Sequence, residues 1–278
     1  MRSLKLAALV ALALASPAAA KDWTKVTIAT EGAFAPWNLT ESDGTLAGFE
    51  VDLYKDLCAR MNVECTMIAQ NWDGIIPGLL AGKYDAIMAG MSATEEREEV
   101  IAFSQAYGST GQTFGVLADG DLAGLPMKGE LFSLVSNPEG VQEAVEALRP
   151  LLDGKTIGVQ SASIGAKFIE ENFGDAVEIR EYKSTDEHDL DLLAGRVDAV
   201  MASPAYLMTA TENPNNKGMV MAGPRFQGGM LGKGSSVGLR KEDTELKAMF
   251  DKAISEAKAD GTTKAISEKW FGFDVTVY

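Results

Sequence analysis

Two segments of the chain are nearly identical: LLAGKYDAIMAG at residues 79–90 and LLAGRVDAVMAS at residues 192–203. Eight of the twelve positions agree, and the copies start 113 residues apart. Each is typical of a helix end, a turn and a buried strand, because Gly82 and Gly195 can take the left-handed conformation in which helices often end. Chance is the alternative, since such helix-to-strand turns are common. The matching flanks on both sides favour a repeated α/β unit.

Strands and helices alternate around each copy. The first copy lies among expected strands at 26–30, 66–69 and 85–89, and the second among expected strands at 155–159, 177–182 and 197–202. Amphipathic stretches between them predict helices, with Asp73 capping one and Ser184 and Glu187 in capping-box spacing at the start of another. We expect a loop at 31–48 and a short strand end just after it. The order predicts two α/β lobes, each with a largely parallel sheet.

The remaining segments connect or complete these units. Residues 119–153 form an acidic connection with one expected helix, capped by Asn137 and started by Pro138. The glycine-rich stretch at 225–240 contains GKG but lacks the hydroxyl residue and the spacing of a phosphate-binding loop. It is therefore expected as a crossover strand with turns, followed by an amphipathic helix that ends at Asp260 and Gly261.

The first twenty residues, MRSLKLAALVALALASPAAA, have the pattern of a secretory signal peptide cleaved after Ala20. A membrane anchor is the alternative, but the apolar run is well short of the roughly 20 residues that a bilayer needs. No later segment is long and apolar enough to span a membrane. We therefore expect an exported protein without direct membrane insertion.

The charge balance restricts the partners. Without the two basic residues of the first twenty, the chain has 23 basic and 40 acidic residues, a formal charge close to −17. Such a field repels nucleic acids and anionic lipids and attracts cations. The two cysteines, Cys58 and Cys65, suit a disulfide in an oxidising compartment. A metal or redox pair would require closer spacing or further ligands, and the chain has one histidine.

A ligand site is expected where the strands end. Ligands of open parallel sheets bind beyond the carboxyl ends of the strands, which brings Glu31 with Phe34, residues 90–92, residues 160–164 and Ser203 around one cleft between two lobes. Ser92 and Glu95 have capping-box spacing, so a short helix is expected to start there with free N–H groups.

Arg97 and Glu31 are the candidate charged contacts. A guanidinium at Arg97 can bind a carboxylate with two parallel hydrogen bonds, although pairing with one of the neighbouring glutamates is the alternative. Glu31 can bind a cationic group, or it is a surface acid. Trp72 and Phe34 can enclose an aliphatic or guanidinium portion of a ligand, or they belong to the core. His188 lies among acids at a helix start and is expected on the solvated surface.

Seven segments together identify a family resemblance. They are TIATEGAFAPWN, GFEVDLYKDLCARMNVEC, WDGIIPGLLAGKYDAIMAGMSATEERE, IAFSQAY, GRVDAVMAS, GPRFQGGMLGKGSSVGLRKED and ADGTTKAISEKWFGFD. The chain resembles, over 21–278, the periplasmic solute-binding proteins of polar amino-acid ABC importers (extracellular solute-binding proteins of family 3), most closely the octopine, nopaline and arginine binders. The connection at 119–153 resembles the longer insert of the opine subgroup.

The resemblance implies a periplasmic-binding-protein fold of type II. In that fold two α/β lobes, here 21–112 with 236–278 and 113–235, are joined by two hinge strands near 112–118 and 232–239. It also implies a monomer that closes over a small amino-acid-like ligand, docks on an inner-membrane ABC permease and uses neither a metal nor a cofactor.

The resemblance also assigns site residues. Arg97 matches the arginine that binds an α-carboxylate, aided by backbone N–H groups at Ser92 and near Ile164; Glu31 matches an acid that faces a cationic side chain. The full set of implied ligand contacts is Glu31, Phe34, Trp72, Ala89, Gly90, Ser92, Arg97, Gln160, Ser163, Ile164 and Ser203.

One departure concerns the ligand. Ser203 stands where binders of free amino acids generally have an aspartate against the α-ammonium, and the opine binders are similar to this chain there. Arginine, ornithine, lysine and opines such as octopine or nopaline are therefore all candidate ligands. Two other function classes stay open: a dehydratase-like enzyme, for which Glu31 is the one candidate acid or base, and a sensor domain that docks on a membrane receptor.

Overall fold

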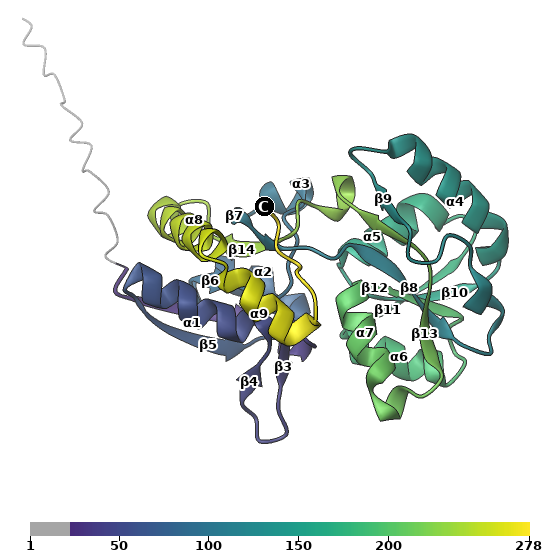
Figure 1. Cartoon of the computed structure of the whole chain (residues 1–278), viewed down its shortest axis with the longest axis horizontal. Helices are drawn as coiled ribbons and strands as arrows, with labels where there is room; N and C mark the ends of the chain where they lie inside the picture. Colours follow the sequence, from purple (N-terminus) through teal and green to yellow (C-terminus); the bar gives the residue numbers. More distant parts are fainter. Residues whose placement is uncertain (1–22) are drawn as a thin grey trace, which may run out of the picture.

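The computed structural model describes residues 23–278, which form two α/β lobes side by side (Figure 1). The predicted signal peptide and its cleavage site lie outside the described residues. Each lobe has its own sheet and its own buried apolar clusters. The predicted type II architecture of two α/β lobes is confirmed.

The first lobe is built on a five-stranded sheet in the order β5-β1-β6-β14-β7. β1 pairs in parallel with β5 and β6, and β14 runs antiparallel to both β6 and β7. The strands are β1 (Lys25–Thr30), β5 (Glu64–Ala69), β6 (Ala86–Ile87), β7 (Ala102–Gly108) and β14 (Ser235–Leu239). A small antiparallel sheet comprises β2 (Ala33–Phe34), β3 (Asn38–Thr40) and β4 (Leu46–Ala47).

Helices cover both faces of this sheet, and the chain returns at its C-terminus to complete the lobe (Figure 1). The helices are α1 (Phe49–Met61), α2 (Ile75–Leu80), α3 (Glu95–Glu98), α8 (Thr244–Ala259) and α9 (Thr262–Phe271), with a 3₁₀ turn η1 (Trp72–Gly74) before α2. Apolar residues of α1, α8 and α9 form one buried cluster against the sheet, and α2 packs on the other face.

The second lobe repeats the arrangement in a six-stranded sheet, β11-β10-β12-β8-β13-β9. β10 pairs in parallel with β11 and β12, and β8 runs antiparallel to β12, as β14 does to β6. The strands are β8 (Gln112–Leu117), β9 (Leu131–Ser133), β10 (Thr156–Gln160), β11 (Glu178–Tyr182), β12 (Ala199–Ala202) and β13 (Met219–Gln227).

The helices of the second lobe follow the predicted pattern. They are α4 (Pro138–Leu152), α5 (Ile164–Phe173), α6 (Thr185–Leu193) and α7 (Pro204–Glu212), with 3₁₀ turns η2 (Asp121–Gly124), η3 (Pro214–Asn216) and η4 (Gly229–Leu231). The predicted cap of α4 is confirmed, because the Asn137 side chain accepts a hydrogen bond from the Gly140 N–H and Pro138 is the first helical residue.

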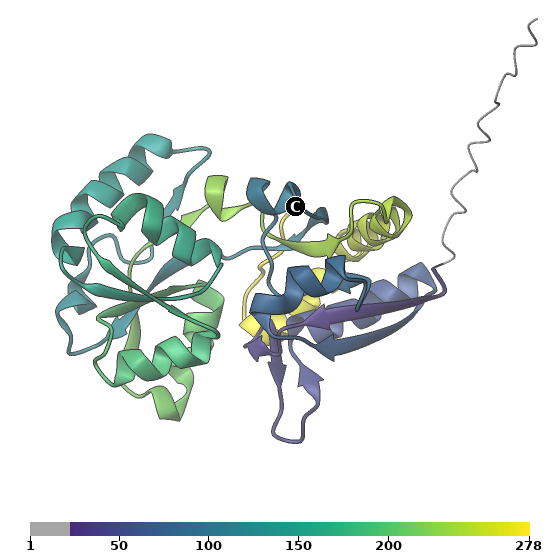
Figure 2. The same ribbon diagram turned by 180° about the vertical axis from the view of Figure 1, so that it is seen from behind.

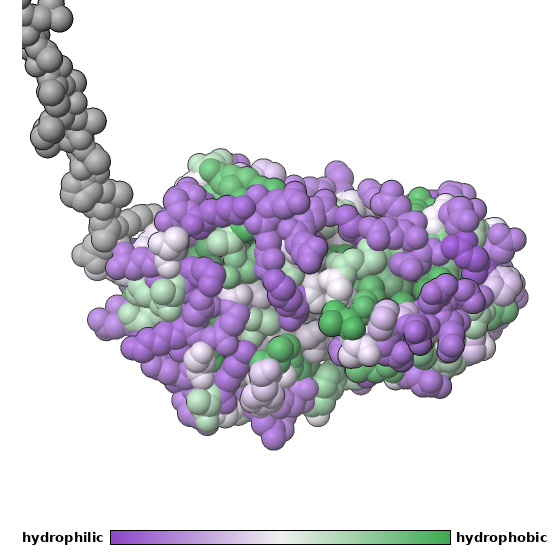
Figure 3. All heavy atoms as spheres, turned by 90° about the horizontal axis from the view of Figure 1, so that it is seen from above, coloured by the Kyte–Doolittle hydropathy of each residue, from purple (hydrophilic) through white to green (hydrophobic). Residues whose placement is uncertain are grey.

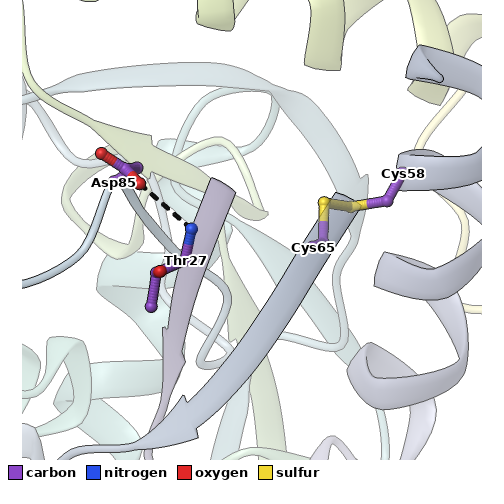
Figure 4. The surroundings of a disulfide bond; sticks show 4 residues. All are labelled: Thr27, Cys58, Cys65 and Asp85. Carbon is purple, nitrogen blue, oxygen red and sulfur yellow. Dashed lines mark hydrogen bonds between the residues drawn. A yellow bond between two sulfur atoms is a disulfide. The ribbon is translucent and has the colours of Figure 1, made fainter. Parts of the chain in front are cut away.

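The repeated segment makes the same pair of hydrogen bonds in both lobes. Asp85 donates its N–H to the Thr27 carbonyl and accepts the Thr27 N–H on its side chain at 3.0 Å (Figure 4). Asp198 makes the same pair of bonds with Thr156, with a side-chain distance of 2.8 Å. The aspartate thus aligns β6 or β12 with the first strand of its lobe.

Alternation along β6 and β12 explains the shared apolar residues. Ala199 and Met201 point to the cluster under α4 and α5, whereas Val200 and Ala202 point to the cluster under α7. The residues at the matching positions of the first copy, from Ala86 to Ala89, alternate between two clusters in the same way. A parallel strand covered on both faces needs apolar residues at every position.

The chain passes between the two sheets twice, at residues 109–111 and 228–234 (Figure 2). The segments expected as hinge strands are therefore β8 and β14 for most of their length, and each of these strands pairs within a single sheet. Positive φ angles of 75° at Gly111 and 81° at Gly232 occur in the passages. An added Cβ at Gly111 would lie 2.5 Å from the Phe226 carbonyl oxygen, so this passage needs glycine.

The predicted disulfide is present between Cys58 near the end of α1 and Cys65 in β5 (Figure 4). Cys58 is buried in the core cluster of the first lobe, and Cys65 packs against that cluster. The disulfide therefore fastens the return from α1 to the edge strand of the sheet.

Replacing both cysteines with serine should lower the free energy of unfolding by about 2–3 kcal/mol, because the unfolded chain regains the entropy of a short closed loop. Urea unfolding of the wild type and the double variant measures the difference. A reducing agent should destabilise the wild type and leave the double variant unchanged. Equal stability under oxidising conditions would contradict the prediction.

Some local predictions are wrong. Residues 31–48 include the three strands of the small sheet rather than a plain loop, and the expected strand end at 49–51 is the first turn of α1. Asp73 does not cap α2 but lies within η1. The Ser184 side chain makes no capping bond, although Glu187 accepts the Lys183 N–H at 3.0 Å.

The prediction that His188 lies on the solvated surface is also wrong. His188 is a residue of α6, and its side chain is fully buried. Its Nδ1 lies 3.0 Å from Asp189 Oδ1, and its ring meets those of Tyr182 and Tyr206 edge-on. A run of polar neighbours at a helix start indicated exposure, but the helix directs this one side chain inward.

Within residues 23–278, no helix combines the length and the apolar character that crossing a bilayer requires. Figure 3 shows a mainly hydrophilic face on which hydrophobic residues form separate patches.

Candidate functional site

A cavity lies between the two lobes, at the carboxyl ends of their parallel strands. Its empty volume of about 740 Å³ includes space that is open to solvent. All eleven residues that the sequence assigns to the site line it: Glu31, Phe34, Trp72, Ala89, Gly90, Ser92, Arg97, Gln160, Ser163, Ile164 and Ser203. Their contacts with a ligand stay a prediction.

The repeated segment explains why the cavity lies here. Gly90 and Ser203 are the last residues of the two copies, and both line the cavity, together with Ala89 and Ala202 just before them. The copies therefore end facing each other across the cleft. The repeat thus supplies one wall of the cavity from each lobe.

Arg97 reaches from α3 across to the second lobe. One guanidinium nitrogen donates to the Ser92 carbonyl and the other to the Ala162 carbonyl, both at 3.0 Å. Its Cζ lies 5.2 Å from the centre of the Trp72 ring. Among the described residues no ion pair joins Arg97 to a neighbouring glutamate; Glu96 pairs with Lys167 and Glu98 with Lys233.

The surroundings of Arg97 are suited to an anion. Desolvation lowers the pKa of the half-buried Arg97 guanidinium to about 10, and the negative charge of Glu96 opposes this shift. A buried cation that donates to neutral carbonyls gains when a carboxylate approaches its remaining N–H groups. The short helix that positions Arg97 is capped by Thr94, whose side chain accepts the Arg97 N–H, and not by Ser92 as predicted.

Glu31 follows β1 directly and also lines the cavity. The Gln160 side chain of the second lobe donates to its carboxylate at 2.6 Å. Burial raises the pKa of Glu31 to about 7; the Gln160 bond lowers it, and the charges of Asp186, Asp73 and Glu50 raise it. A cationic group that enters the cavity would relieve this cost, so Glu31 is placed to bind one.

Aromatic side chains form another part of the cavity wall. Phe34 stacks on Tyr206 of the second lobe, with ring centres 5.4 Å apart and planes 13° from parallel. Trp72 donates its indole N–H to the Ser161 carbonyl at 3.1 Å. Gly90 lets Phe34 lie close, because an added Cβ there would come within 2.8 Å of the phenyl ring.

Behind the cavity, the fully buried Glu50 joins two of the loops that line it. Its carboxylate accepts from the Gly90 N–H and the Asn38 amide, both at 2.7 Å, and from the Tyr107 hydroxyl. Asn38 in turn accepts the Gly32 N–H at 2.7 Å. Burial raises the pKa of Glu50, and the three donors oppose that shift. Sequence analysis did not single out Glu50, since its spacing is that of an ordinary first-turn acid.

The passages between the lobes also contribute residues that the sequence analysis missed. These are Ser109, Thr110, Gly111, Gly228, Leu231 and Gly232, with the flanking strand residues Gln112, Gln227 and Ser235. Thr110 and Ser203 share a hydrogen bond of 2.7 Å between their buried hydroxyl oxygens. The strand-end rule could not find these residues, but any segment that joins two lobes must pass the cleft between them.

The lobes are closed on each other around the cavity. Besides the contacts of Arg97, Trp72 and Gln160, the Ser161 hydroxyl donates to Asp73 at 2.9 Å and the Thr185 hydroxyl to the Ala33 carbonyl at 3.2 Å. Lys167 pairs with Glu96 at 2.7 Å at the rim. Within residues 23–278, no group of three His, Cys, Asp or Glu side chains is placed to hold a metal ion.

The family match and the similar proteins of known name agree with each other. Residues 26–273 match the family of bacterial extracellular solute-binding proteins, family 3. The octopine-binding periplasmic protein of Rhizobium meliloti is 45% identical, with 99% of each chain covered. The histidine-binding periplasmic protein of Escherichia coli strain K12 is 35% identical, with 98% of this chain and 97% of the relative covered.

A solved structure has the same architecture. A periplasmic His/Glu/Gln/Arg/opine family-binding protein from Silicibacter pomeroyi, in complex with lysine, matches with a TM-score of 0.71 at 32% identity. The match covers 91% of this chain and 100% of that one.

Proposed function

Because this chain belongs to the bacterial extracellular solute-binding proteins of family 3, we propose that it binds a cationic amino acid or an opine and releases it to an ABC importer. The observation that carries the proposal is the cavity between the lobes that both Arg97 and Glu31 line. A solute with a carboxylate and a separate cationic group matches both charges.

The relatives narrow the ligand class. They bind octopine and histidine, and the solved structure holds lysine. Ser203 bonds to Thr110, so its position offers a hydroxyl in place of the aspartate expected against a free α-ammonium. This favours the opines, octopine and nopaline, which also agree with the similarity to the octopine-binding protein; arginine, ornithine and lysine stay candidates.

Function as a transport receptor also requires export and docking on a permease. We propose that residues 1–20 are a signal peptide cleaved after Ala20, and that the mature protein is a periplasmic monomer that docks on an inner-membrane permease. The lobes, with bounds at 21–112 plus 236–278 and at 113–235, open and close about the two passages between them. A role as the sensor domain of a membrane receptor would use the same closure with a different docking partner.

Catalysis is the weaker candidate. The family and the relatives above are binding proteins. An enzyme would use Glu31 as its acid or base, and a pKa of about 7 would suit that chemistry. The same shift suits a site for a cation, because the half-buried carboxylate has the neutral Gln160 amide as its partner and a bound cation would lower its pKa. We therefore propose binding without chemical change.

Calorimetry of residues 21–278, freed of copurified solute by unfolding and refolding, tests the proposal. Arginine, ornithine, lysine, histidine, octopine and nopaline are the probes. At least one cationic amino acid or opine should bind with a Kd of about 1 μM or below, and the recovered solute should be chemically unchanged. The absence of binding to all six, or conversion of the solute, would reject the proposal.

A further inference from the structure

One tyrosine of the second lobe faces the first lobe but does not line the cavity. Tyr206, in the first turn of α7, is 3% exposed and stacks on Phe34 of β2. Phe34 packs against the buried clusters of both lobes, and the neighbouring Ala205 belongs to the core cluster of the first lobe. The start of α7 is therefore a contact surface between the lobes.

A buried polar network holds this tyrosine in place. Its hydroxyl donates to Asp189 Oδ2 at 2.7 Å and lies 3.4 Å from Asp186 Oδ1. The other Asp189 oxygen lies 3.0 Å from Nδ1 of His188. Asp189 is 2% exposed and His188 is fully buried. Desolvation, with the nearby charge of Asp189, raises the pKa of Tyr206 well above its usual value, so the hydroxyl stays a donor.

The stack depends on closure. Phe34 and Tyr206 belong to different lobes, so separating the lobes must part their rings, whereas the bonds among Tyr206, Asp189 and His188 lie within the second lobe and persist. Thr185, on the same helix as Asp189, bonds to the Ala33 carbonyl and closes against the same short strand. Closing therefore forms the Phe34–Tyr206 stack and opening breaks it, while the hydrogen bonds that hold Tyr206 stay in place.

We propose that Tyr206 is a closure residue, which fixes the Phe34 wall of the cavity in the ligand-bound state, and that Asp189 and His188 position its ring. This rests on the proposed function, because it assumes that a solute drives the lobes together. Tyr206 acts through Phe34 and does not touch the solute.

A double-mutant cycle tests the stack. The wild type, Phe34→Leu, Tyr206→Leu and the double variant are titrated with octopine and with L-arginine, and each is also melted without solute. An aromatic pair adds about 0.5–1.5 kcal/mol beyond its buried area, so the Kd values should depart from independence by about 2- to 12-fold. The melting temperatures without solute should be additive, since the open state lacks the contact.

The outcomes separate the two proposals. Independent effects on Kd, or coupling of the same size in the melting temperatures without solute, would overturn the role of Tyr206 and leave solute binding intact. A wild type that binds neither probe nor any other of the six solutes would remove both proposals. Tyr182→Leu combined with Phe34→Leu is the matched control, because Tyr182 also meets the His188 ring but bonds to Asp191 of its own lobe. That pair should be independent.

Milder variants test the positioning residues if Tyr206→Leu unfolds. Tyr206→Phe keeps the ring and removes the hydroxyl, and should raise the Kd about 2- to 10-fold, as expected for one buried hydrogen bond. Asp189→Asn should raise the Kd in the wild type but have little effect in the Tyr206→Phe background. An equal effect in both backgrounds would show that Asp189 does not act through Tyr206.

Discussion

Replacing Arg97 with alanine is expected to weaken solute binding by about 30-fold or more. The Arg97 side chain is half-buried, and a bound carboxylate would complete a charge pair in the cleft. Removing one partner of a buried charge pair costs about 2–5 kcal/mol, or roughly 30- to several-thousand-fold in Kd. The substitution also removes the donor to the Ala162 carbonyl, which is one of the contacts that hold the lobes together. Calorimetry with octopine and L-arginine measures the loss.

Two further variants complete this test. Arg97→Lys keeps the charge but cannot donate to both carbonyls and to a carboxylate at once, so it should bind with intermediate affinity. Arg196→Ala is the control, because Arg196 is exposed and pairs with Asp191 on the surface of the second lobe. An unchanged Kd in Arg97→Ala would show that the carboxylate binds elsewhere in the cavity.

Acidification should weaken the binding of L-arginine by about 30-fold between pH 8 and pH 5.5. The pKa of Glu31 is about 7 without solute, so its charge is present above that pH and is lost below it. A cation that requires the ionised carboxylate loses roughly tenfold in affinity for each further pH unit. The guanidinium and both backbone groups of arginine keep their charges throughout this range.

Matched probes isolate the charge. Citrulline, the neutral analogue of arginine, should bind with little dependence on pH, and Glu31→Gln should remove the dependence for arginine. An identical pH profile for arginine and citrulline would refute the assignment of Glu31.

The same carboxyl affects stability with the opposite sign. The unfolded chain releases this proton near pH 4.5 and the folded chain, without solute, near 7. Between these values the folded state holds more protons, so the Glu31 contribution to stability falls as the pH rises.

The fold could be predicted because its signals are local and occur twice. These signals depend on residues that are close together in the sequence: glycine turns, alternating strands and helices, and aspartates at fixed positions. The small sheet at 33–47 was missed since its strands are two or three residues long, too short for a period to show. Asp73 was assigned to a cap because the sequence could not show that the Ser161 hydroxyl of the other lobe bonds to it.

The site was predictable where strands end and less so elsewhere. Gly90, Ser92 and Ser203 follow buried strands directly, so the strand-end rule places them at the cleft. Arg97 and Glu31 gained their roles from a resemblance, because a charged residue in a loop has no pattern of its own. Glu50 and His188 were missed or misplaced because their burial depends on which helix face turns inward, and weakly amphipathic helices do not reveal it.

The place of β14 has a consequence for biosynthesis. This strand lies between β6 and β7 but is made more than 120 residues after them. A growing chain that has reached η4 contains every strand of the second sheet, while β6 and the edge strand β7 of the first sheet still lack their common neighbour β14. The second sheet can therefore be completed before the first, whose last strand, β14, follows all the strands of the second lobe in the sequence.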